Sequence, residues 1–216
     1  MKYEIDNFAI DNHFSSSVYR VHKPEFLDIV RPVFNDFLEI SKREQDPNPV
    51  YPGIMTGLIS EDERATPFVQ YVSNISWDVL DRQGYDMSNF YTNAMEMWGQ
   101  HHPYRSSMEN HIHGSSTQLV GFYFLDTPSE SSSLSIHDPR AVKVYASLPV
   151  KESNKCLSSY NIITYSPEPG DLIFTNSWLA HSFTRNVSQT PYNFIHINVS
   201  VVSRGDVQTQ AKPIII

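Results

Sequence analysis

Apolar residues recur at helical spacing in two stretches of the first half of the chain. Between residues 23 and 43 they repeat every three or four positions, the period of an amphipathic helix. Pro24 suits a first turn and Pro32 lies inside the pattern, so we expect a short turn followed by a longer helix. A second helix is expected from Ser60 to about Leu80. The proline- and glycine-rich segment Asp46 to Gly57 is expected to be an ordered loop.

The rest of the chain is typical of β-strands. A short strand is expected before Lys23, and seven runs rich in β-branched and aromatic residues follow the second helix. These runs are Phe90–Trp98, Gln118–Leu125, Ser133–His137, Val142–Ala146, Ile162–Tyr165, Asp171–Thr175 and Tyr192–Ser203. Helices followed by strands, without alternation, favour a mainly antiparallel sandwich or barrel backed by helices. We expect a single domain over 1–216, with a helical support region (1–88), a β core (89–204) and a tail (205–216).

Composition narrows the class of protein. Hydrophobic residues make up 40% and charged residues 19%, which is typical of a globular chain. The net charge of -8 and the absence of any basic run argue against nucleic acid or an anionic membrane as partner. With one cysteine, Cys156, no signal-peptide pattern and no apolar run near the ~20 residues of a membrane span, we expect a cytoplasmic protein, or one in the host cytoplasm if it is phage-encoded.

Among the nine histidines, His111 and His113 have the spacing of a metal-ligand pair. Because they flank one residue, an extended segment would project both side chains from the same side. His181, which follows a Pro-Gly turn and a strand, is the best candidate for a third ligand. The alternative is that the pair is merely two polar residues at a strand start.

The remaining histidines have other interpretations. His101 and His102 lie in a polar, proline-containing stretch and are expected to be solvated. His137 could be a ligand or support one. His196 lies in an apolar strand and is expected to be a hydrogen-bonded core residue.

A set of short motifs resembles a family of bacterial and phage proteins assigned as 2-oxoglutarate/iron(II) oxygenases. The resemblance covers about Trp98 to Asn198 and is more distant to the prolyl hydroxylases of the same superfamily. It implies a double-stranded β-helix, which is a jelly roll of cupin type, with Fe(II) on His111, His113 and His181. The motifs are Trp98, Asn110-His111-Ile112-His113, Gly121-Phe122-Tyr123-Phe124-Leu125, Asp138-Pro139-Arg140, Pro169-Gly170-Asp171-Leu172, Leu179-Ala180-His181 and Asn198.

The resemblance further implies 2-oxoglutarate as co-substrate, whose decarboxylation is coupled to hydroxylation of a C–H bond. Two departures bear on this. His113 stands where the wider superfamily has a carboxylate, and the arginine that usually binds the distal carboxylate is missing from the strand that follows His181, which reads Thr190-Pro191-Tyr192-Asn193. The candidate cofactor-binding residues are Arg140, Tyr123, Asn198, Arg185 and Asn110.

Several alternatives stay open at this point. A three-histidine dioxygenase would let the substrate chelate the iron without 2-oxoglutarate. A cupin-like binding module would need no metal. A zinc hydrolase is chemically allowed, although the motif order argues against it. The substrate could be a small molecule or a peptidyl side chain, and the apolar tail Pro213–Ile216 leaves a homodimer open.

Overall fold

The computed structural model describes residues 9, 11–46, 49–114, 116–146, 148–149 and 159–205. The α-helices are α1 (Leu27–Glu44) and α2 (Thr66–Arg82), and the 3-10 turns are η1 (Pro24–Phe26), η2 (Ile59–Glu61), η3 (Glu63–Ala65) and η4 (Ala141–Ala146). The strands are β1 (Val18–His22), β2 (Ile54–Leu58), β3 (Phe90–His102), β4 (Met108–His111), β5 (Leu119–Asp126), β6 (Leu134–His137), β7 (Ile162–Tyr165), β8 (Asp171–Asn176), β9 (His181–Phe183) and β10 (Tyr192–Ser203).

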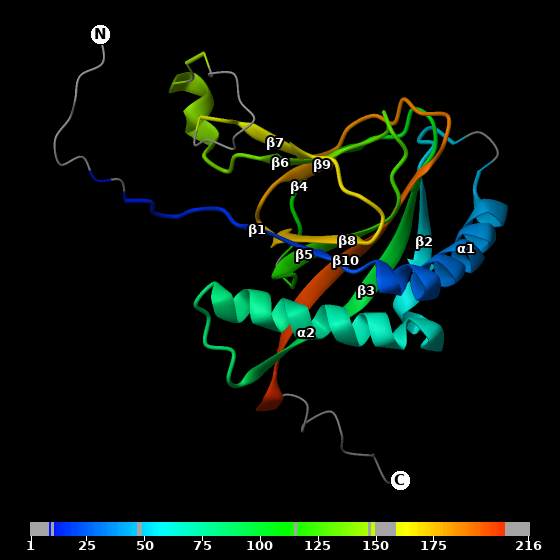
Figure 1. Cartoon of the computed structure of the whole chain (residues 1–216), viewed down its shortest axis with the longest axis horizontal. Coiled ribbons are helices and arrows are strands. Elements are labelled where there is room, and N and C mark those ends of the chain that lie inside the picture. The colour runs from blue at the N-terminus through cyan, green and yellow to red at the C-terminus, as the bar shows by residue number, and fades with distance from the viewer. Residues whose placement is uncertain are drawn as a thin grey trace.

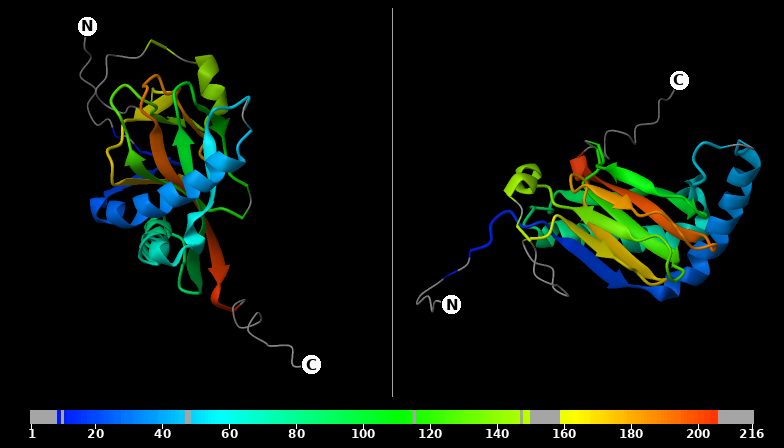
Figure 2. Two further views of the ribbon diagram at one scale, coloured as in Figure 1. Left: turned by 90° about the vertical axis from the view of Figure 1, so that its right-hand side faces the viewer. Right: turned by 90° about the horizontal axis from the view of Figure 1, so that it is seen from above.

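The strands form two facing antiparallel sheets. The larger has the order β1-β8-β5-β10-β3-β2 and the smaller the order β4-β9-β6-β7. Figure 1 shows α1 and α2 on the outer side of the larger sheet and the smaller sheet on its other side, and Figure 2 shows the sheets stacked. Mainly β structure with two long helices is the jelly-roll architecture that the sequence predicted, and that prediction is confirmed.

Strand β5 divides the interior into two cores because its side chains alternate between the two faces of the sheet. Leu119, Tyr123 and Leu125 pack in the core under the helices. Phe122 and Phe124 pack in the other core, between the two sheets. Both faces of β5 are therefore covered, which explains why the whole strand is apolar.

Helix α1 lies unusually close to the sheet at one point. An added Cβ on Gly99 of β3 would run into the ring of the buried Phe34 of α1. The amide of Gly99 donates to the Thr56 hydroxyl at 2.7 Å. Glycine at this position thus sets the distance between the helix layer and β3.

The predicted helices need small corrections. A short turn, η1, does precede a longer helix, but α1 continues through Pro32 and the break lies ahead of Leu27. The second helix begins at Thr66, because residues from Ile59 to Ala65 form two 3-10 turns. Neither α-helix, and no other helix in the described part of the chain, has the length and apolarity to cross a bilayer.

Three strand predictions were wrong or incomplete. Part of the expected loop Asp46 to Gly57 is strand β2, whose Ile54 and Thr56 point inward and which pairs with β3. Val142–Ala146 lies in η4, where Lys143 N donates to Arg140 O in a helical turn. Strands β4 and β9, of four and three residues, were missed. The tail beyond residue 205 lies outside the described residues.

Candidate metal centre

Four histidines converge at one end of the space between the sheets. They are His111 at the end of β4, His113 two residues later, His181 at the start of β9 and His196 in β10. One nitrogen of each lies within 4.8 Å of those of the others. The structure therefore brings together the three histidines that the sequence singled out, from segments 70 residues apart in the chain, and adds a fourth.

Backbone contacts orient two of the rings. His111 and His181 are opposite each other in the β4–β9 pair. Nδ1–H of His111 donates to Glu109 O at 2.8 Å, and Nδ1–H of His181 donates to Leu179 O at 3.1 Å. Each bond fixes the proton on Nδ1, so that the Nε2 lone pair is free for a metal.

The third ring is held through its main chain. His113 N donates to Ser177 O at 3.0 Å, which ties the segment after β4 to the turn after β8. The Nε2 atoms of His113 and His181 are buried and have no hydrogen-bond partner among the described residues. Buried nitrogens without partners are rare and require an explanation, and a metal ion would provide one.

Burial keeps these imidazoles neutral. It lowers the pKa of His113 to about 4, with the neighbouring His111 as a second cause. It lowers the pKa of His181 to about 3, against a small opposing effect of the Leu179 carbonyl. Neutral imidazole is the form that binds metal, so both side chains are ready ligands at pH 7.

His196 corrects one prediction. It is fully buried, but neither ring nitrogen has a hydrogen-bond partner in the described part of the chain, so it is not a hydrogen-bonded core histidine. Its ring stacks on Trp98 with centroids 4.3 Å apart and lies 4.9 Å from that of His113. Burial holds its pKa well below the usual value. Alternation along β10 places it on the inner face together with Phe194, a signal that the sequence did carry.

The donor set fits a divalent transition metal. Imidazole suits iron, zinc and copper alike, and three nitrogens on one side leave the other positions of an octahedral ion open. No Asp or Glu among the described residues joins the group. The nearby Glu96 is exposed and accepts from Asn198 Nδ2 at 3.0 Å. The centre is therefore all-histidine.

The predicted cofactor-binding residues are dispersed. Arg140 is exposed and pairs with Asp138 at 2.7 Å, and Arg185 is exposed after β9. Tyr123 faces the helix layer, where its hydroxyl donates to Lys23 O at 2.8 Å, so it points away from the histidines.

The two predicted asparagines differ in setting. Asn110 is exposed on β4 beside His111. Asn198 lies two residues beyond His196 on β10, and its Oδ1 is buried without a partner in the described structure. Of these two residues, Asn198 is therefore the one with a buried unpartnered atom, on the same strand as His196.

The other histidines lie outside the cluster. His137 Nε2 shares a hydrogen bond with Ser182 Oγ at 2.9 Å, and His101 Nδ1 with Asn193 Oδ1 at 2.8 Å. The expectation that His101 and His102 are solvated in a loop is wrong, because β3 extends to His102, which is completely buried.

The space between the sheets beyond the cluster is lined by aromatic rings. Phe122, Phe183 and Phe194 pack there, the last two stacked with centroids 4.3 Å apart. No lysine or arginine in the described part of the chain is buried. The buried polar groups without a partner in the described structure include the Tyr192 hydroxyl and both nitrogens of His102, two residues that are paired in the β10–β3 register. Sequence reasoning missed both.

Comparisons with known proteins agree with this geometry. Residues 96–195 match the sequence profile of a family described as "Putative 2OG-Fe(II) oxygenase". These residues make up just under half of the chain, and over them the chain is similar to that family. The match covers the three predicted ligands and His102 and Tyr192, and it confirms the resemblance that the motifs indicated. The family's two cofactors are those that the sequence predicted. No curated protein matches the chain.

Solved structures with the same fold are distant in sequence. The carbocyclase SnoK of nogalamycin biosynthesis, described as α-ketoglutarate dependent, has a TM-score of 0.61 and 11% identity over 92% of this chain and 87% of its own. A prolyl-4-hydroxylase of Pseudomonas putida has a TM-score of 0.57 and 10% identity over 86% and 93%. The epimerase SnoN, solved with Fe3+ and α-ketoglutarate, has 0.54 and 10% over 88% and 82%. These likenesses show the fold.

Proposed function

We propose that this protein is an iron(II)- and 2-oxoglutarate-dependent oxygenase that hydroxylates its substrate, with His111, His113 and His181 as the iron ligands. One observation carries the proposal: three imidazoles, each with an Nε2 atom available to a metal, converge in a chain that is similar to the family of such oxygenases. When bound, the iron would allow dioxygen to oxidise a C–H bond and 2-oxoglutarate by two electrons each, giving the hydroxylated product, succinate and carbon dioxide.

Coordination number separates the roles of the four histidines. Three ligands leave three of about six positions of an iron(II) ion open, enough for a chelating oxoacid and dioxygen together. A fourth histidine ligand would leave only two. We therefore infer that His196 does not bind the metal. It is stacked against Trp98 as a buried neutral group beside the metal.

The charge of the centre bears on how a dianionic co-substrate is held. A site with two histidines and one carboxylate cancels one charge of the metal, whereas three neutral histidines cancel none. A bound divalent ion is the largest local charge in such a site, so the all-histidine set attracts 2-oxoglutarate more strongly at the metal.

At the far end of the barrel, hydrogen bonds have to replace the missing guanidinium. The Tyr192 hydroxyl is buried and without a partner in the described structure, and it lies on the strand after His181 where the superfamily carries its arginine. We assign it as donor to the distal carboxylate. A hydrogen bond to a charged group contributes roughly 1.5–3 kcal/mol, so Tyr192→Phe should raise the Kd for 2-oxoglutarate about tenfold or more without weakening iron binding.

The test is a visible spectrum recorded without oxygen. Iron(II)-loaded protein should develop a weak metal-to-ligand charge-transfer band only when 2-oxoglutarate is added. His111→Ala and His181→Ala should lose the band, and the exposed His13→Ala should keep it.

Two outcomes would contradict the proposal. Iron bound by these histidines without any band would indicate a dioxygenase that does not use 2-oxoglutarate. Failure of the wild-type protein to bind iron would refute the metal centre itself. An unchanged Kd in Tyr192→Phe would remove only the anchor assignment.

A further inference from the structure

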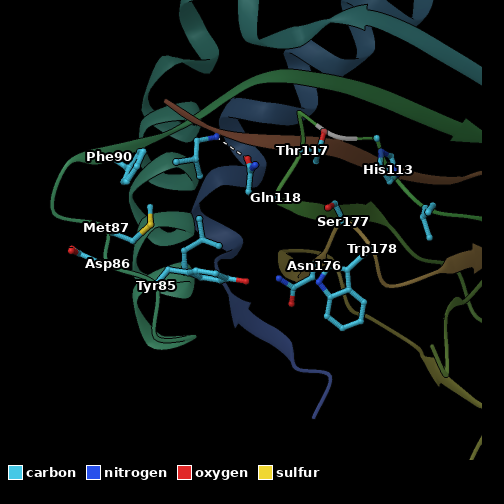
Figure 3. Close-up of a pocket in the computed structure, with 14 residues that line it drawn as sticks. Tyr85, Asp86, Met87, Phe90, His113, Thr117, Gln118, Asn176, Ser177 and Trp178 are labelled. Atoms are coloured by element: carbon cyan, nitrogen blue, oxygen red, sulfur yellow. Dashed lines mark hydrogen bonds between the residues drawn. The ribbon is translucent and has the colours of Figure 1, made fainter. Parts of the chain in front are cut away.

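A cleft of about 720 Å³ opens beside the metal centre. One wall is formed by Tyr85 and Met87, in the segment that links α2 to β3, and by Phe90, the first residue of β3. The opposite wall is the turn after β8, including Trp178, and His113 lies at the inner end, as Figure 3 shows. The cleft thus leads from the surface to one of the proposed iron ligands, where a substrate must lie.

The walls of the cleft carry large apolar side chains that remain exposed. Tyr85 is 56% exposed, Trp178 is 48% exposed and Ile112 is 59% exposed. Scattered apolar side chains on a surface are ordinary, but a concave group of them beside a reactive centre indicates a binding site. A volume of this size falls within the roughly 300–1,000 Å³ typical of small-molecule pockets.

The cleft has no cationic side chain that would bind an anionic ligand. Its lining includes no lysine or arginine, and its one carboxylate, Asp86, points away from the cavity in Figure 3. A phosphate or carboxylate placed along these walls would lose its hydration without gaining a cationic side chain as partner, which is unfavourable.

The polar groups of the cleft are few and mostly engaged. Asn176 and Gln83 bond to each other through both side-chain amides, at 3.0 and 3.3 Å. Gln118 Oε1 accepts from Val201 N at 2.9 Å, which leaves its NH₂ group as a donor. An extended peptide would bring two backbone polar groups per residue into this apolar surface, and most would find no partner. A small molecule with one or two acceptors would not have this penalty.

The floor of the cleft is held by main-chain bonds that also hold the metal ligand. Gln118 N donates to Val199 O at 2.8 Å, Ser177 N donates to Gln118 O at 3.0 Å, and His113 N donates to Ser177 O at 3.0 Å. A ligand seated on this floor is therefore fixed relative to His113, which is the positioning that a regioselective oxidation requires.

We propose that this cleft is the substrate site and that it takes a neutral, largely apolar small molecule with a ring system, stacked between Tyr85 and Trp178, and one acceptor for Gln118. The assignment rests on the proposed function for its chemistry, but binding in the cleft needs no metal. Aromatic stacking favours a planar ligand over an aliphatic one of equal size.

Two dyes that differ by one sulfonate test the proposal on the full-length, metal-free protein. N-phenyl-1-naphthylamine is neutral, and 8-anilinonaphthalene-1-sulfonate is its anionic counterpart. Fluorescence titration should give at least tenfold tighter binding of the neutral dye. Trp178→Ala and Tyr85→Ala should each weaken it about tenfold, while replacement of Tyr104, another exposed tyrosine that does not line the cleft, by alanine should not.

A variant that fills the cleft without disturbing the fold shows whether loss of dye binding is due to misfolding. A Cβ at Gly114, which lines the cleft, meets no atom within 4 Å, so Gly114→Leu should block the dye at unchanged thermal stability. Equal affinity for both dyes, or binding that survives Trp178→Ala and Gly114→Leu, would overturn the proposal. His181→Ala should still bind the neutral dye. In the wild-type protein, failure to bind iron with retained dye binding would refute the oxygenase alone, and iron binding without dye binding would refute the cleft alone.

Discussion

His102 provides a quantitative test of how burial affects the stability of this fold. Its side chain is completely buried at the end of β3, and neither ring nitrogen has a partner among the described residues. It meets Phe183 and Phe194 edge-on, with centroids 5.9 and 5.2 Å away. Burial, with a small contribution from His101, lowers its pKa to about 4.

The sign of the effect follows from the direction of this shift. The unfolded chain binds a proton at this histidine near its ordinary pKa of 6.5, whereas the folded chain resists protonation down to about 4. Stability from this residue is therefore fully present above about pH 6.5 and is lost as the pH falls from 6.5 to 4. Between pH 7 and pH 5 the loss is about 2 kcal/mol.

We expect His102→Phe to remove this loss. The larger ring will shift the free energy of unfolding by an amount that does not depend on pH, so the observable is the change between the two pH values. Urea unfolding followed by circular dichroism, with a chelator present, should give a fall about 2 kcal/mol smaller in the variant than in the wild type. His113 and His181 contribute the same sign in both proteins and cancel in the comparison.

The control is His13→Phe, because His13 is exposed and its replacement should leave the pH dependence unchanged. Equal losses in the wild type and His102→Phe would refute the reasoning. That result would mean that the ring is hydrated or moves outward when it is protonated, so that burial in the native structure does not set its proton affinity.

Two further predictions concern metal binding and backbone geometry. Saturating cobalt(II), at about 100 times its Kd, should stabilise the wild type and His196→Phe by about 2.7 kcal/mol, as measured by urea unfolding, but not His181→Ala; loss of this effect in His196→Phe would make His196 a ligand. Gly84 and Gly170 both have positive φ, at +93° and +92°, but only at Gly170 would a Cβ meet a backbone atom, Pro24 Cα at 2.7 Å. Gly170→Ala should therefore cost more than Gly84→Ala, by about 1–3 kcal/mol, and equal unfolding midpoints would contradict this.

The elements that could be predicted were those whose sequence pattern is long and clearly bounded. Strand β10 was predicted at its observed bounds, Tyr192–Ser203, because its run of β-branched and aromatic residues is long and clearly bounded. Strands β4 and β9 were missed because segments of four and three residues carry no periodicity. Their pairing is set by the sheet that they complete, and that information is not local.

In the site, too, local sequence patterns could be predicted and features set by distant pairing could not. His111 and His113 are close in sequence, so their spacing already indicated that they could bind the same metal ion. The orientation of Tyr123 could not be deduced, because β5 is buried on both faces and an uninterrupted apolar run does not show which side faces the barrel. His102 was misjudged from its polar neighbours, since β3 continues through them to pair with β10.

The two departures of this chain from its superfamily are physically connected. In the proposed centre, His113 in place of a carboxylate ligand would leave a divalent metal with its full charge, and a dianionic co-substrate would then be held more strongly at its oxoacid end. A guanidinium at the far end becomes less necessary, and a neutral hydroxyl such as that of Tyr192 can complete the binding. The replacement of a guanidinium by a hydroxyl agrees with the absence of any buried lysine or arginine from the described part of the chain. On this argument the missing arginine and the third histidine are a single adaptation, so neither alone is a reason to reject 2-oxoglutarate as the co-substrate.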